Sequence, residues 1–363
     1  MNVAEETIDW LAGEQFRIDD RWSYLVPTGF TWWPDQYAQT VEIVREQTGP
    51  RGETGYLVCV RTELLRDLDL TDSALAEINA LSMRCASMSG PVYDAAARRL
   101  DLWSMARMHD DNGPWMRHLI AAAAVTQIAE ARSLAQILAE RTGALPATSG
   151  HPEGGLRTSP DRILSAAVDF VGSGEEPCAW TEDEFSDTVG RHMIGIPGAT
   201  AAGRGFTVDI PFGAETSRLR VTGDQPHPLY GNGLLVLQRF PVRSGSEAEG
   251  IRLALSLNAA DLTREHTGYG FGSYAYADGD VYFTGFVPNA LHRPGLLANL
   301  YHSGAARVQA MAARFVEGGW DPEAYSLDAA VLARRQAERE AARPAAEPAP
   351  RGCPVMRAKT GGN

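Results

Sequence analysis

The feature of this sequence that most limits its possible folds is an internal repeat, because a repeated sequence builds the same structural unit more than once. The second half of the chain follows the first at an offset of 176 to 180 residues. The shared order of the matches and their near-constant offset predict two copies of one unit. The matched segments are Gly29-Phe30-Thr31 with Gly205-Phe206-Thr207, residues 55–59 with 233–237, Asn79-Ala80 with Asn258-Ala259, and Pro114 with Pro294.

Each copy contains the same succession of expected elements: a short helix, three strands, a second helix, a hairpin and a long closing helix. The third strand is a continuous apolar run in both copies, which is typical of a strand covered on both faces. The expected ranges before the closing helix are 4–14, 24–33, 38–45, 54–65, 72–84 and 99–108 in the first copy, and 181–193, 204–210, 216–222, 232–241, 247–261 and 274–286 in the second.

Local signals support these elements. Asp278-Gly279 is the strongest short signal for a hairpin turn, and Ser244 lies three residues before Glu247, as in a capping box. Both closing helices carry a stripe that steps by four and three residues, which predicts a face packed on a sheet or a helix. At an offset of 177 residues, the stripes are Ile120, Ala124, Gln127, Ala131, Leu134 and Leu138, and Leu297, Tyr301, Gly304, Val308, Met311 and Phe315.

The sequence therefore predicts an α+β fold made of two copies of an α-βββ-α-ββ-α unit, with antiparallel sheets, packed helices and a pseudo-two-fold axis. The two copies are residues 1–141 and 161–325. Residues 142–160 are rich in Gly, Pro, Ser and Thr, so we expect an exposed linker there. Residues 326–363 are expected to form a polar helix followed by a disordered basic tail.

The charge of the chain favours some partners over others. The net charge is -13, and residues 331–363 contain seven basic and three acidic residues, so residues 1–330 carry -17. An acidic protein repels phosphate backbones, so we expect no nucleic-acid partner, and we expect a basic client to be favoured. The N-terminal sequence lacks the features of a signal peptide, and no apolar run has the length of a membrane span. We therefore expect a cytoplasmic protein without a membrane partner.

The order of elements, with the textures of the hairpin and the closing helix, resembles the fold of class I type III secretion chaperones and their YbjN-like relatives. The resemblance covers both copies but rests on no motif. It implies a tandem duplication that forms a pseudo-dimer in one chain. It also implies that an extended segment of a client protein binds along apolar surface.

Two sets of residues are candidates for that client surface. Trp22, Trp32 and Trp33 belong to an aromatic cluster, and tryptophan is enriched in binding hot spots. Adjacent residues of a strand point to opposite faces, so Trp32 and Trp33 share a core only if the sheet is covered on both sides. Met105 and Met108 flank the hairpin of the first copy, and methionine suits adaptable binding surfaces. For both sets the alternative is ordinary core packing.

The C-terminal tail is a further candidate. Cys353, Pro354, Val355 and Met356 form a small apolar island between basic residues, beyond a proline-rich spacer. This island is a candidate docking peptide for a partner, or a segment that folds back on the acidic body. The alternative is a disordered end without a role.

No residue pattern points to catalysis, a metal or a cofactor. His109-Asp110-Asp111-Asn112 precedes Gly113-Pro114 and fits a turn and helix cap better than a metal site. None of the common nucleophile, zinc-protease or phosphate-loop motifs occurs. Of the eight histidines, only His292 and His302 are candidates to approach one another, and their spacing of ten residues does not align them on a helix.

The sequence thus predicts a non-catalytic chaperone or adaptor that holds a client polypeptide. One alternative is a structural subunit of a larger assembly, which a stoichiometric partner would reveal. The other is an enzyme whose site forms only in three dimensions, by gathering pairs such as His109 with Asp110 or His266 with Glu265.

Overall fold

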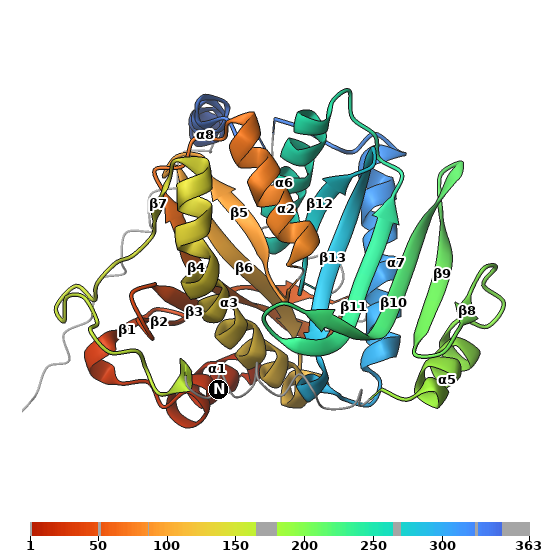
Figure 1. Ribbon diagram of the computed structural model, residues 1–363, viewed down its shortest axis with the longest axis horizontal. Helices are drawn as coiled ribbons and strands as arrows, with labels where there is room; N and C mark the ends of the chain where they lie inside the picture. The colour runs from red at the N-terminus through yellow and green to blue at the C-terminus, as the bar shows by residue number, and fades with distance from the viewer. Residues whose placement is uncertain are drawn as a thin grey trace, which may run out of the picture.

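The protein consists of two antiparallel sheets with helices packed on them, as the computed structural model shows (Figure 1). The structure describes residues 2–49, 52–85, 87–164, 180–263, 270–323 and 326–342. The predicted α+β class is confirmed. No helix within these ranges is long and apolar enough to cross a membrane.

The first half forms one sheet and three α-helices. Its elements are α1 (Val3–Trp10), the π-helical turn η1 (Leu11–Gln15), the 3-10 turn η2 (Asp20–Trp22), β1 (Ser23–Val26), β2 (Gly29–Trp32), β3 (Gln39–Thr48), β4 (Thr54–Arg66), α2 (Asp72–Arg84), β5 (Gly90–Asp94), β6 (Arg99–Met108), α3 (Gly113–Thr142) and β7 (Leu145–Pro146).

The second half forms the other sheet. Its elements are α5 (Glu182–His192), β8 (Thr200–Ala201), β9 (Gly205–Phe212), β10 (Glu215–His227), β11 (Gly231–Phe240), α6 (Glu247–Thr263), β12 (Ser273–Ala277), β13 (Asp280–Pro288), the 3-10 turn η4 (Asn289–Leu291), α7 (Leu296–Phe315) and α8 (Ala329–Ala342).

The two sheets have the same strand order. The first runs β1-β2-β3-β4-β6-β5, and the second, read from its other end, runs β8-β9-β10-β11-β13-β12. Each unit therefore has four strands before its second helix, where three were predicted. In the first half the expected strand 24–33 is the hairpin β1–β2, and in the second half the short β8 is added. A duplication would produce this shared topology, and the common origin of the halves stays an interpretation.

The closing helices pack on their own sheets through the predicted stripes. In α3, the Gln127 side chain donates to the Val60 carbonyl at 3.1 Å and to Ser104 Oγ at 2.8 Å. In α7, Gly304 takes the matching position, and its carbonyl accepts from Gln238 Nε2 at 2.9 Å. A Cβ on Gly304 would lie 2.7 Å from Leu219 Cδ2, so glycine permits the close approach of α7 to the sheet.

The two halves meet along β5, β12, α2 and α6, and they share one core. The helices α2 and α6 lie side by side between the sheets (Figure 1). One buried apolar cluster contains both Ile120 and Leu297, and another contains both Leu75 and Leu255. Because both clusters draw on both halves, the halves stabilise one another.

The expected linker, residues 142–160, is exposed only in part: residues 146–151 are buried or half-buried against the first half, whereas residues 152–156 and 158–160 are exposed. Its strand β7 pairs with β4, and the Ala147 amide donates to the Leu64 carbonyl at 3.0 Å. The Ser149 amide donates to the Gln36 carbonyl at 2.8 Å. Backbone hydrogen bonds along β4 and the loop before β3 therefore hold this segment against the sheet, although its composition is that of a loop.

Candidate functional site

Trp32 and Trp33 point to opposite faces of the first sheet, and both faces are covered. The Trp32 ring stacks on Phe16 at 5.3 Å, on the face that α1 and η1 cover. The Trp33 indole donates to Ser149 Oγ at 3.0 Å, so residues 142–160 cover the other face. Only 1% and 4% of these side chains are exposed, respectively. In this structure neither tryptophan offers surface to a client. Trp32 is covered by η1, and Trp33 is covered by the segment that the sequence predicted to be an exposed linker.

The other candidate residues differ in accessibility. Met105 and Met108 are fully buried in the sheet. Trp22 is half-buried, with the guanidinium groups of Arg21 and Arg157 each 5.5 Å from its ring. Of the five side chains proposed for the client surface, Trp22 alone is therefore partly accessible. The tail island Cys353–Met356 lies outside the residues that the structure describes.

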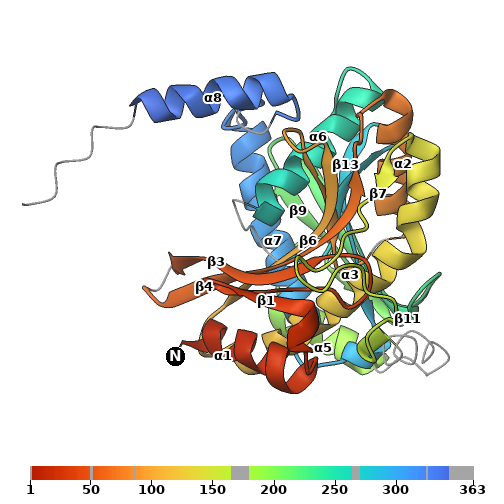
Figure 2. The same cartoon turned by 90° about the vertical axis from the view of Figure 1, so that its left-hand side faces the viewer.

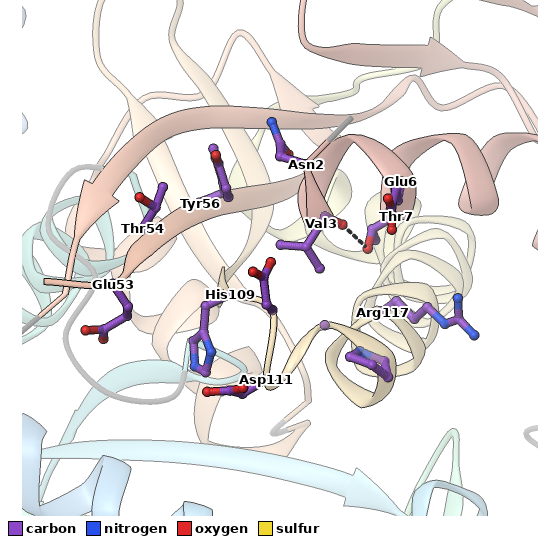
Figure 3. Close-up of a pocket in the computed structure, with 13 residues that line it drawn as sticks. Asn2, Val3, Glu6, Thr7, Glu53, Thr54, Tyr56, His109, Asp111 and Arg117 are labelled. Carbon is purple, nitrogen blue, oxygen red and sulfur yellow. Dashed lines mark hydrogen bonds between the residues drawn. The ribbon is translucent and has the colours of Figure 1, made fainter. Parts of the chain in front are cut away.

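An open pocket lies instead where the start of α1, the start of β4 and the turn between β6 and α3 come together (Figure 3). Its volume is about 880 Å³. Its lining residues are Asn2, Val3, Glu6, Thr7, Glu53, Thr54, Tyr56, His109, Asp110, Asp111, Gly113, Pro114 and Arg117. We call this the acidic pocket, because carboxylates are its main charged groups.

Local hydrogen bonds fix the turn that forms one wall of the acidic pocket. The His109 amide donates to Asn112 Oδ1 at 2.9 Å, and Asn112 Nδ2 donates to the Arg107 carbonyl at 2.9 Å. Asn112 stands at the N-cap position of α3, but its side chain makes no capping hydrogen bond, so the expected turn and helix start form without the expected side-chain cap. The side chains of His109 and Asp111 lie next to each other on this wall (Figure 3).

The opposite wall is the N-terminal end of α1. Asn2 caps this helix, and a capping box with Glu5 fixes its first turn. A Cβ on Gly113 would collide with the side chain of Val3. Glycine at the start of α3 therefore lets the two helix starts approach, and Glu6 is brought to the pocket with them.

The charge of the pocket is negative. Among the described lining residues, Glu6, Glu53, Asp110 and Asp111 are acidic and Arg117 is the one arginine; its guanidinium lies over the Trp10 ring at 4.6 Å. Arg107 approaches Glu53 at 3.5 Å, whereas no ion pair between described residues involves Glu6, Asp110 or Asp111.

The hydroxyl of Tyr56 reflects this environment. Partial burial first, and then the carboxylates of Glu46, Glu5 and Asp110, raise the pKa of Tyr56. A carboxylate raises the pKa of a neighbouring acid by disfavouring a second negative charge. The same potential favours a bound cation in the pocket.

The pocket was only partly foreseeable. Asp110 and Asp111 stand out in the sequence, but Glu6, Glu53 and Arg117 carry no local signal, because their convergence depends on tertiary packing. Within the described ranges, no group of three or more His, Cys, Asp and Glu side chains is arranged to hold a metal ion. Glu265 and His266, the other pair considered for a site, lie outside the described residues.

The corresponding position in the second half is filled. The turn 289–292 replaces 109–112, and Leu291 is buried there. Trp180 is fully buried, and its ring meets that of His292 edge to face at 5.2 Å. His292 Nε2 lies 3.1 Å from Glu184 Oε2, and His302 Nε2 lies 3.4 Å from His192 Nδ1, so each of these histidines contacts a residue of α5. The two halves thus differ at this position, with an open acidic pocket in one and packed aromatic side chains in the other.

Fold and site together define a two-halved α+β protein with an acidic pocket in its first half. Comparisons with protein-family models, with curated proteins and with solved structures found no match to this chain.

Proposed function

We propose that this protein is a non-catalytic chaperone or adaptor, and that it holds a basic segment of a client protein in the acidic pocket. The observation that carries the proposal is the pocket itself, an open cavity of about 880 Å³ in which the described lining residues supply four carboxylates and one guanidinium. The resemblance to secretion chaperones supports a polypeptide client. The apolar residues expected to bind the client are buried, namely Trp32, Trp33, Met105 and Met108. We therefore assign the client contact to the charged surface of the acidic pocket.

The chemistry of the pocket suits arginine and lysine side chains. Carboxylates accept charge-assisted hydrogen bonds from guanidinium and ammonium groups. The half-buried ring of Tyr56 adds a face on which a cation can stack. The charge of -17 over residues 1–330 steers a basic partner toward the body of the protein. Because exposed charges are screened by salt, binding should weaken as ionic strength rises.

The test is the binding of a fluorescent arginine-rich 12-residue peptide to the full chain, followed by anisotropy. We expect the double substitution Asp110→Asn, Asp111→Asn to weaken binding at least tenfold, since each removes a charged acceptor. The matched control is Glu182→Gln, Asp183→Asn, which removes the same charge from an exposed first turn of α5. Equal loss in both variants would show a general charge effect and contradict the proposal.

One observation favours a catalytic role as a second candidate. The pocket is lined by His109, Asp110 and Asp111, and a histidine gathered with carboxylates in a pocket is a candidate for acid–base catalysis. No hydrogen bond between described residues joins the His109 ring to either carboxylate. Turnover of an ester or phosphoester substrate that His109→Ala abolishes, in a chain that still folds, would establish catalysis and replace the chaperone role.

A further inference from the structure

The chain carries a basic segment of its own beyond the last described helix. Residues 343–363 contain Arg343, Arg351, Arg357 and Lys359 but a single acidic residue, Glu347. We propose that this segment, the basic tail, occupies the acidic pocket of its own chain and competes there with the client. The inference rests on the proposed function of the pocket and adds its regulation.

The tail is long enough to reach the pocket. The structure describes the chain as far as Ala342, and 21 residues follow. At about 3.3 Å per residue, a fully extended chain carries Arg351 roughly 30 Å and Lys359 roughly 56 Å from Ala342. A compact body of this size has a radius of gyration of about 20 Å, or roughly 50 Å across. In both views α8 lies at the top of the molecule and α1 at the bottom, so the tail must run along most of the height of the molecule to reach the pocket at the start of α1 (Figures 1 and 2).

The chemistry of the tail matches that of the pocket. Arg351 and Arg357 flank the apolar island Cys353–Met356, and Lys359 follows. In the pocket, Asp110 and Asp111 are exposed, whereas Val3 and Tyr56 are half-buried and offer apolar surface. An apolar segment between two cations therefore fits a cavity that combines apolar surface with carboxylates.

Tethering makes even a weak contact effective. A segment tethered to its site by a spacer long enough to span the distance has an effective concentration on the order of 1 mM. With a tail affinity of about 0.1 mM, the tail would weaken the apparent affinity of a client by about tenfold. The basic tail would then exclude weakly basic partners and release the pocket to strongly basic ones.

Lys359 allows a direct test, because it is the only lysine in the chain. A carbodiimide joins a carboxylate to a primary amine only where the two are in contact. We expect the full-length monomer to form an intramolecular link from Lys359 to Glu6, Glu53, Asp110 or Asp111, identified by mass spectrometry. Lys359→Arg keeps the charge but removes the amine, so this link should disappear. Links from Lys359 only to carboxylates elsewhere, or only between molecules, would overturn the inference.

A second measurement separates this inference from the proposed function. The substitutions R351E, R357E and K359E in the full chain reverse the charge of the tail. We expect them to increase the affinity for the arginine-rich peptide about tenfold. Peptide binding at the pocket with no change in this variant would contradict tail competition and leave the proposed function intact. If the parent chain forms the Lys359 link to the pocket but the peptide binds neither the parent nor the variant, the tail contact is supported and the client role is contradicted.

Discussion

A buried carboxyl group, Glu130, joins the two halves of the molecule. It lies on α3 of the first half and accepts a hydrogen bond from the Tyr230 hydroxyl of the second half at 2.6 Å. Ser89 Oγ donates to its other oxygen at 2.9 Å. Burial raises the pKa of Glu130 to about 7, and the hydrogen bonds from Tyr230, Ser89 and Ser87 oppose the rise.

This pKa gives the protein a pH-dependent stability. Because the folded pKa lies above the ordinary value of 4.5, stability is fully present below pH 4.5 and is lost as pH rises through 7. Glu130→Gln keeps an acceptor for Tyr230 but cannot ionise. Between pH 5 and 9 we expect the free energy of unfolding of the parent to fall by about 3 kcal/mol relative to the variant. Urea titrations at both pH values measure this difference, and parallel pH profiles would contradict the assignment.

A buried ion pair in the second half permits a comparison with an exposed one of equal length. Arg314 lies 2.7 Å from Asp261 in the core, and Arg191 lies 2.7 Å from Asp187 on the surface of α5. We expect Asp261→Ala to destabilise the fold by about 3 kcal/mol, because it leaves a buried charge without this carboxylate. Asp187→Ala should cost less than about 1 kcal/mol. Thermal unfolding of the two variants tests this, and equal losses would show that burial does not decide the effect.

At the scale of elements, the edge strand β12 is closed by asparagine side chains rather than by another strand. Asn258 of α6 exchanges two hydrogen bonds with the backbone of Tyr274, at 3.2 and 2.7 Å. Asn79 of α2 does the same with Tyr276, at 2.7 and 2.8 Å, from the other half of the molecule. The two asparagines that match in the repeat therefore cap one strand, which satisfies backbone groups that an open edge would expose.

Removing one of these caps should loosen β12 locally. We expect Asn79→Ala to speed hydrogen exchange of the Tyr276 amide about tenfold, because that amide loses its hydrogen-bond acceptor. The Tyr274 amide, held by Asn258, serves as the internal control and should change less. Equal acceleration at both amides would mean that the strand opens as a unit.

The sequence predicted most elements because their signals are local. The range 72–84 matches α2, and the Asp278-Gly279 turn joins β12 to β13 with both residues at positive φ. Two predictions failed, one because the turn lacks a sequence signal and the other because two nearby serines could both cap the helix. The hairpin β1–β2 turns at Pro27-Thr28, which lacks the usual glycine or asparagine. At the start of α6, Ser246 rather than Ser244 accepts the capping hydrogen bond, from the Glu249 amide at 3.3 Å.

The functional site was harder to predict than the elements. The aromatic cluster that includes Trp32 and Trp33 was found, but the burial of Trp33 depends on residues 142–160, whose composition indicates a loop. Glu6 and Glu53 are far apart in sequence from Asp110. Glu6 joins it because α1 packs on the start of α3, and Glu53 because β4 pairs with β6 so that Tyr56 lies opposite Met108. Tertiary contacts of this kind leave no periodic pattern in a sequence.

In the whole molecule, the two halves share one strand topology but differ in the side chains at one corresponding surface position. Both sheets have the same strand order, and apolar clusters drawn from both halves hold them together. The acidic pocket of the first half has Trp180 and Leu291 buried at the corresponding position of the second. A molecule of this kind can therefore use one half for binding and the other for support.

The central claim is that a basic client segment binds in the acidic pocket, and hydrogen exchange with mass spectrometry tests it most directly. The arginine-rich peptide would be added to the full chain carrying R351E, R357E and K359E, so that the basic tail does not compete. Slower exchange confined to residues 53–56 and 109–113 is the predicted result, because these backbones line the pocket. Slower exchange at α5 and α7, or no change anywhere while the peptide binds, would contradict the account.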